Sequence, residues 1–185
     1  MPEIEIRPLP AIASRLCTDL KASKRLAAHL ALVHDAAVQV CDTIDAAWPG
    51  LPYDREAVLV GAATHDLGKV LHPRELTGPG SCHERDGPRL LLENGCKPEH
   101  ARFAGTHGHA SDAHDATLED LLVALADGAW KGARLERLET RISEGLAALA
   151  GVDTWETFAV LDATLERIGR DADARLAWQA IGEPR

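Results

Sequence analysis

The chain has 185 residues and a formal net charge of −9, which comes from 29 acidic and 20 basic side chains. This length is typical of one domain, and 45% apolar with 26% charged residues is the balance of a globular protein rather than a disordered tail or a rod. The sequence has no block rich in Lys and Arg, which argues against duplex nucleic acid and anionic membranes as partners. Aromatic residues reach only 4%, which disfavours a large β-sandwich.

The cysteines and the amino-terminal segment indicate in which cellular compartment the protein is expected. The four cysteines have no CxxC spacing, which is typical of reduced, mostly buried thiols: Cys17, Cys41, Cys82 and Cys96. The first ten residues lack the basic start and apolar core of a signal peptide. No apolar run approaches the roughly 18 residues that span a bilayer. We therefore expect a cytoplasmic protein.

Helical periodicity dominates the whole chain and predicts an all-α, single-domain protein. Ser23 and Thr117 are the expected N-caps of two of the helices. Residues 70–81, with two prolines and two glycines, are expected to form an ordered loop, and 108–116 a polar connection. The expected helices cover residues 11–21, 23–47, 55–68, 83–94, 98–106, 117–130, 135–150 and 154–181.

The nine histidines exceed what a core needs, and three of them precede an aspartate. His65-Asp66 stands out because it ends an apolar helix and is followed by Gly68 and Lys69. Burying an imidazole and a carboxylate without partners costs several kcal/mol, whereas a metal ion satisfies both. The alternative is a simple helix end with a surface ion pair. Asp35 and His114, from the other two dipeptides, are expected to be dispensable for activity.

Five further positions carry side chains that could serve the same site. Asp127 lies on an apolar helix, and His83 precedes Gly87 by one turn. His107 and His109 lie between glycines at a helix end, and His34 adjoins the apolar stripe of the helix over 23–47. Each of these residues alone has an ordinary interpretation, as a solvent-facing carboxylate, a surface-loop histidine or a buried boundary histidine.

Taken in order, these residues resemble the HD-domain metal-dependent phosphohydrolase superfamily, whose pattern is His, His-Asp, His, His and Asp on helices or helix ends. Residues 65–69 are very close to the form HD-x-G-K, and His83-x-x-x-Gly87 also fits, whereas Pro88 departs from the usual small helix former. His107 and His109 compete for one position, and His107 is preferred because it ends the preceding helix. The matching residues are His34, His65, Asp66, His83, His107 and Asp127; His29, His72, His100 and His114 have no place in the pattern.

The resemblance implies one HD domain over residues 1–185, with a metal-site core at about 26–131 and helices over 135–181 packed on it. It implies one or two divalent ions, of Fe, Mn, Ni, Zn or Mg. The ligands of one ion would be His34, His65, Asp66 and Asp127. Asp66 would bridge to a second ion, held by His83 and His107.

The implied activity is hydrolysis of a phosphomonoester or phosphoanhydride of a small molecule, with a nucleotide favoured, by a hydroxide that bridges the metals. Asp66 and Lys69 would be catalytic, and Lys69, His72 and His109 would contact the substrate. Two alternatives stay open: a di-iron oxygenase acting on a small phosphonate or polyol, and a non-catalytic ligand sensor. The apolar stripe of the last helix covers either the core or a partner in a homodimer.

Overall fold

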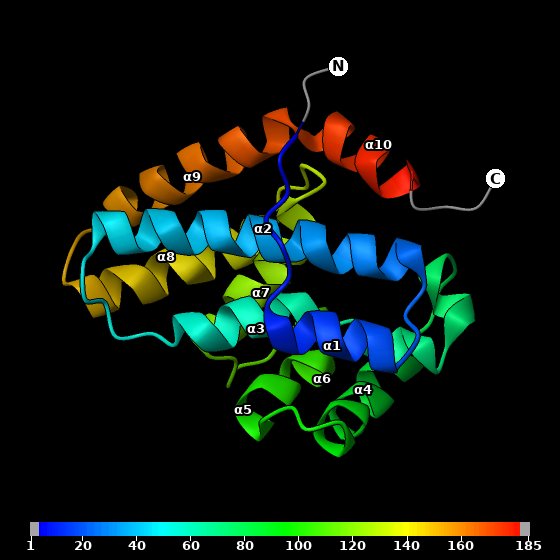
Figure 1. Ribbon diagram of the computed structural model, residues 1–185. Helices are drawn as coiled ribbons and strands as arrows, with labels where there is room; N and C mark the ends of the chain where they lie inside the picture. The colour runs from blue at the N-terminus through cyan, green and yellow to red at the C-terminus, as the bar shows by residue number, and fades with distance from the viewer. Residues whose placement is uncertain (1–3, 182–185) are drawn as a thin grey trace.

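The computed structural model describes residues 4–181, and all regular secondary structure in that range is helical, as predicted (Figure 1). Short 3₁₀ helices connect several of the α-helices. The elements are α1 (Ala11–Asp19), α2 (Lys24–Ala47), α3 (Arg55–Thr64), η1 (Leu67–Val70), η2 (Pro73–Leu76), α4 (Cys82–Glu93), α5 (Pro98–Ala101), α6 (Phe103–Thr106), η3 (His107–His109), α7 (Leu118–Ala129), α8 (Glu136–Ala150), α9 (Thr154–Arg170) and α10 (Ala172–Ile181).

Side-chain capping explains where three of the helices begin. The Ser23 hydroxyl accepts a hydrogen bond from the backbone N–H of Leu26 (3.2 Å), and Asp54 caps α3 in the same way (2.9 Å). Thr117 and Asp120 form a reciprocal capping box at the start of α7. These contacts satisfy backbone donors that have no partner within the helix. The N-caps predicted at Ser23 and Thr117 are confirmed.

The helix predicted to run on to about Gly68 ends instead at Thr64, and the chain continues through η1. Gly68 lies at the crossing of η1 and α4, where a Cβ atom would be 2.3 Å from the backbone oxygen of His83. Only glycine allows the two backbones to approach so closely. This crossing carries His83 toward Asp66, which directly precedes η1.

The helix predicted over residues 154–181 breaks at Asp171 into α9 and α10, which are inclined to each other above α2 (Figure 1). Arg175 of α10 donates a hydrogen bond to Asp35 of α2 (2.7 Å), and both side chains are almost fully buried. Arg7 and Gln39 donate to the same carboxylate (both 2.9 Å). Burial works to raise the pKa of Asp35, but these hydrogen bonds, led by that of Arg175, hold it below its usual value. A buried ion pair therefore fixes α10 against α2.

Two hydrophobic clusters form the core. The larger one joins α2, α3, α7, α8 and α9, and the smaller one lies among α1, the first turns of α2, α4 and α5. On α2, Leu26 and Leu30 belong to the smaller cluster, whereas Leu32 and Val33 belong to the larger one. His29 lies between Leu26 and Leu30 in the chain, on the part of α2 that packs in the smaller cluster.

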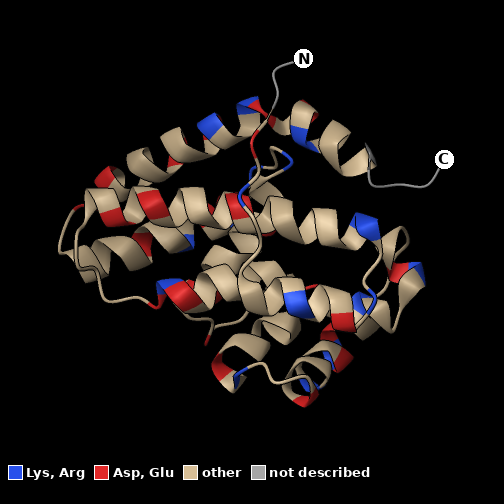
Figure 2. Ribbon diagram, in the orientation of Figure 1, with Lys and Arg blue, Asp and Glu red and all other residues tan. Residues whose placement is uncertain are grey.

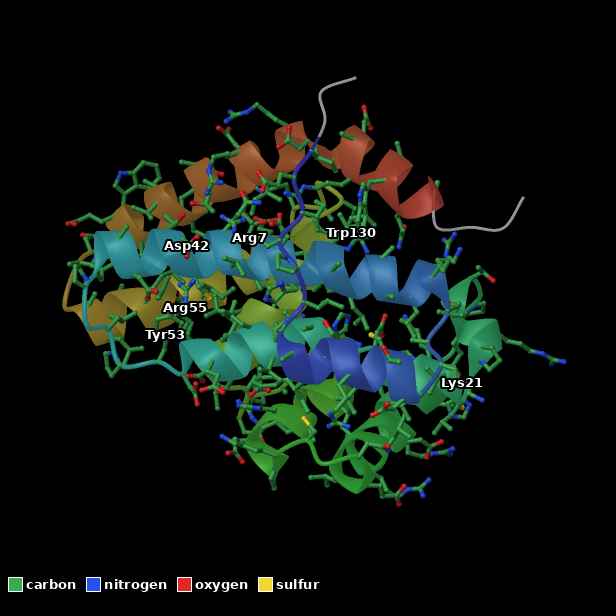
Figure 3. All side chains as sticks on the ribbon, in the orientation of Figure 1. Arg7, Lys21, Asp42, Tyr53, Arg55 and Trp130 are labelled. Carbon is green, nitrogen blue, oxygen red and sulfur yellow. The ribbon has the colours of Figure 1, made fainter. Side chains whose placement is uncertain are left out.

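The connection from α2 to α3 is tied to α2 by polar contacts (Figure 3). Arg55 pairs with Asp42 and Asp45 (2.6 Å each), and the Tyr53 hydroxyl donates to Asp45 (2.7 Å). These contacts set the start of α3, whose far end carries His65. They therefore help to place the first residue of the His-Asp pair.

Surface features bear on the expected partners and location. On the face shown in Figure 2, the described Lys and Arg are interspersed with Asp and Glu along the helices. Within residues 4–181, every helix is too short or too polar to cross a bilayer. All four cysteines are free thiols, as expected. The cytoplasmic location and the exclusion of duplex nucleic acid stay predictions.

Candidate metal centre

Asp66 lies at the centre of a cluster of histidines and is 2% exposed. Its Oδ2 atom lies 3.1 Å from Nε2 of His29 and 3.7 Å from Nε2 of His65. Its Oδ1 atom lies 3.2 Å from Nε2 of His83 and 3.6 Å from Nε2 of His107. Each oxygen of one carboxylate therefore faces its own pair of imidazoles.

Asp127 of α7 adds a second carboxylate to the group formed by Asp66, His29 and His65. Its Oδ1 atom lies 3.3 Å from Nε2 of His29 and 3.7 Å from Nε2 of His65. Ligand atoms that share an ion at about 2.1 Å lie about 3.0–3.4 Å apart in octahedral or tetrahedral arrangements, close to these separations. We call the group of His29, His65, Asp66 and Asp127 the first position, and the group of Asp66, His83 and His107 the second position.

Backbone carbonyls fix the tautomer of two of the imidazoles, that is, which nitrogen carries the hydrogen in the neutral ring. Nδ1 of His65 lies 3.0 Å from the carbonyl oxygen of Ala62, and Nδ1 of His107 lies 3.0 Å from that of Phe103. A carbonyl oxygen only accepts, so each Nδ1–H donates and Nε2 of the neutral ring keeps its lone pair. Both Nε2 lone pairs are available to a cation beside Asp66.

His83 is held in the same way by a carboxylate. Its Nδ1 lies 2.6 Å from Oε2 of Glu75, which also accepts from the backbone N–H of His83 (3.0 Å). Burial works to raise the pKa of Glu75, but the hydrogen bonds from His83 and from the backbone of Cys82 lower it to about 2. A carboxylate behind a metal-binding imidazole orients the ring and increases its basicity. Glu75 was not among the residues predicted from the sequence, because it comes from η2, in the segment expected to be a loop.

The cluster contains buried polar atoms that have no hydrogen-bond partner among the described residues. They are Nε2 of His29, Nε2 of His65, Oδ1 of Asp66 and Oδ1 of Asp127. Burying such atoms unpaired costs free energy, and a coordinated cation removes that cost. Imidazole nitrogens combined with carboxylate oxygens suit divalent Fe, Mn, Ni or Zn. The residues present therefore fit a divalent metal ion.

At the first position, the pKa shifts of His65, Asp66 and Asp127 favour the protonation states that bind metals, whereas burial works to lower the pKa of His29 but Asp127 and Asp66 raise it. Burial lowers the pKa of His65, which keeps the ring neutral. Burial works to raise the pKa of Asp66 and Asp127, but the surrounding histidines hold both well below the usual range. Neutral imidazole and ionised carboxylate are the forms that coordinate cations.

His34 does not join this cluster, which corrects the ligand set expected from the sequence. It lies five residues beyond His29 on α2, which is about 140° around the helix axis at 3.6 residues per turn. Because His29 faces Asp66 and Asp127, His34 points to another side of α2. There it is buried, and its Nδ1 has no hydrogen-bond partner among the described residues.

Two glutamine variants test whether His29, rather than His34, is a ligand in the first position. We expect His29→Gln to lose at least one bound ion per chain, because one imidazole of the first position is removed. His34→Gln, the matched control on the same helix, is expected to keep the wild-type metal content. Elemental analysis of the two desalted proteins measures the difference, and metal loss in His34→Gln alone would reverse the assignment.

His72 and His109 were expected to contact the substrate, but their rings face carboxylates outside the pocket beside Asp66. Nε2 of His72 lies 2.8 Å from a carboxylate oxygen of Asp86. His109 is 58% exposed at its side chain, and its Nδ1 lies 3.7 Å from Glu84. Neither residue lines the pocket that opens beside Asp66. Of the two neighbouring histidines, the structure places His107, and not His109, against Asp66.

A pocket of about 280 Å³ opens beside the first position. Lys69 lines it, with Nζ 2.5 Å from Oδ2 of Asp66. Trp130, which lies between α2 and α10 in Figure 3, forms one wall, and α10 forms another. The lining residues are Arg25, Leu26, His29, Asp66, Lys69, Leu76, Trp130, Lys131, Leu176 and Gln179.

Comparison of the chain with protein-family models, with curated proteins and with solved structures gives no match in any of the three. No relative therefore contributes to the functional argument.

Proposed function

We propose that the protein is a metal-dependent phosphohydrolase of the HD-domain type. Its reaction is hydrolysis of a phosphomonoester or phosphoanhydride of a small molecule, with a nucleotide as the favoured substrate. The observation that carries the proposal is the geometry of Asp66, whose two oxygens each face the Nε2 atoms of two imidazoles. The motif order of the family is kept once His29 takes the place of His34.

The proposed ligands would hold two ions, with Asp66 as a ligand in each position. His29, His65 and Asp127 would complete the first position, and His83 and His107 the second. Divalent ions bound there would supply an acidified water molecule and polarise the phosphoryl oxygens. Asp66 holds the two halves of the site together, since each of its oxygens serves one of them.

The pocket supports an anionic substrate of modest size. Its volume of about 280 Å³ is near the lower end of small-molecule sites. Lys69 is close enough to Asp66 to donate to a phosphate oxygen at the metal centre and to offset charge in the transition state. Arg25 and Lys131 add positive charge to the lining, and the largely buried Trp130 closes one side of the pocket.

The test is metal analysis followed by an activity screen. We expect divalent ions in the purified protein, and release of phosphate from nucleotides or sugar phosphates when Mn²⁺ or Mg²⁺ is added. Bound iron with substrate-dependent oxygen uptake, and no phosphate release, would favour the oxygenase instead. A protein that binds no divalent ion would overturn the enzyme assignment.

Replacing Lys69 by alanine separates catalysis from metal binding. We expect turnover to fall by about 10²-fold, the effect of losing one donor that stabilises transition-state charge. Metal content is expected to stay unchanged, because Lys69 contacts Asp66 without being a ligand. Phosphate-release kinetics and elemental analysis measure the two quantities. Lys97→Ala, an exposed control, should match wild type, and metal loss in Lys69→Ala would contradict its role.

A further inference from the structure

We propose that Glu84 is an additional ligand of the second position, an inference that rests on the proposed metal centre. Glu84 lies in the first turn of α4, directly after His83. Its Oε1 atom is 4.0 Å from Nε2 of His83. One ligand atom each of His83, Glu84 and His107 lie within 4.8 Å of one another. This carboxylate therefore faces the same point as the two imidazoles.

Packing holds the carboxylate there. A Cβ atom on Gly108 would lie 2.5 Å from Oε1 of Glu84, so the carboxylate rests directly on the backbone of η3. Its other oxygen lies 3.7 Å from Nδ1 of His109, and the side chain is only 23% exposed. A glutamate side chain on a solvent-exposed helix face would not be held in place by such contacts. Gly108, the glycine between His107 and His109, makes room for an acidic side chain.

An independent observation points to the same place. Oδ1 of Asp66 is buried without a hydrogen-bond partner among the described residues, and it faces His83 and His107. A cation between these atoms would satisfy Asp66 and attract the Glu84 carboxylate. The second position then has two imidazoles and two carboxylates, the same donor set as the first.

This donor set has consequences for affinity and for charge. Equal sets of ligands predict two ions of the same chemical kind bound with comparable affinity, rather than one tight and one loose ion. Three carboxylates, from Asp66, Asp127 and Glu84, offset all but one of the four positive charges of two divalent ions. The one remaining positive charge would attract an anionic substrate, but less strongly than two divalent ions without carboxylate ligands would.

Manganese binding tests the role of Glu84 directly. Purified metal-free protein is titrated with Mn²⁺, free Mn²⁺ is followed by electron paramagnetic resonance, and bound metal is counted after desalting. We expect wild type to bind two ions per chain. In Glu84→Gln, one ion should bind as in wild type, and the affinity for the second should fall at least about 10-fold. Glu93→Gln, an exposed control on the same helix, should bind two ions like wild type.

The outcomes separate this inference from the proposed function. Wild-type affinity for both ions in Glu84→Gln overturns the ligand role, even if turnover is lost, and so does a wild-type protein that binds a single ion. A wild-type protein that binds no ion overturns the metal centre itself. Glu84→Asp keeps a carboxylate and should recover part of the second-ion affinity, which a purely structural role of Glu84 would not produce.

Discussion

Replacing Asp66 by alanine is expected to remove both ions and to lower phosphate release by at least about 10³-fold, or about 4 kcal/mol of transition-state stabilisation. The reason is that one carboxylate serves both positions, with one oxygen near His29 and the other near His83. Elemental analysis and phosphate-release kinetics on the same preparation measure the two losses.

Two further variants make this result interpretable. Asp66→Asn keeps the shape of the side chain but not its charge, and it is expected to lose metal as well, which excludes a packing effect. His114→Ala is the neutral control, because His114 is exposed and belongs to a His-Asp dipeptide outside the cluster. If Asp66→Ala still bound both ions, the proposed metal centre would be wrong.

Asp35→Ala is expected to lower the free energy of unfolding by about 3–5 kcal/mol, because it leaves the buried Arg175 guanidinium without its carboxylate. For a chain of this size, that corresponds to a fall in melting temperature on the order of 10 °C. The expectation that Asp35 is dispensable for activity stays a prediction; its substitution should act on stability, and not on the proposed ligands. Thermal unfolding measured by circular dichroism checks the effect.

The pH dependence and a double variant sharpen this test. The folded-state pKa of Asp35 is lowered, so its stabilisation is present above the unfolded-state value of about 3.9 and is lost as pH falls through the folded-state pKa. The difference between wild type and Asp35→Ala should narrow in that acidic range. Asp35→Leu combined with Arg175→Met should recover most of the stability, because no buried charge is left unpaired; Arg7, which loses its bond to Asp35, is half exposed and also contacts Asp42. A melting temperature of Asp35→Ala equal to that of wild type would contradict the anchoring role.

Local chemistry made much of the fold predictable from the sequence. The helix starts at Ser23 and Thr117 depend on side chains that accept hydrogen bonds from backbone groups three residues away. The split at Asp171 was not predictable, because residues 154–181 have a continuous helical pattern. The contact that places α10 joins Arg175 to Asp35, which lie 140 residues apart.

The candidate site shows the same division between local and long-range information. His65, Asp66 and the glycine after them form a short motif, so adjacency alone identified them. His29 and His34 flank the apolar stripe of α2 on opposite sides, so spacing could not decide which faces α3 and α7. Glu75 and Glu84 lack any recognisable spacing, because their contacts depend on how η2, η3 and α4 pack.

Part of the pocket wall comes from α10, a segment that supplies none of the proposed ligands. Leu176 and Gln179 face the pocket from this helix, about fifty residues beyond Asp127 in the chain. Under the proposed function, substrate selectivity is separable from the chemistry, since exchanging side chains on α10 changes none of the proposed ligands. A mutagenesis library confined to Leu176 and Gln179 is the natural route to altered substrate preference.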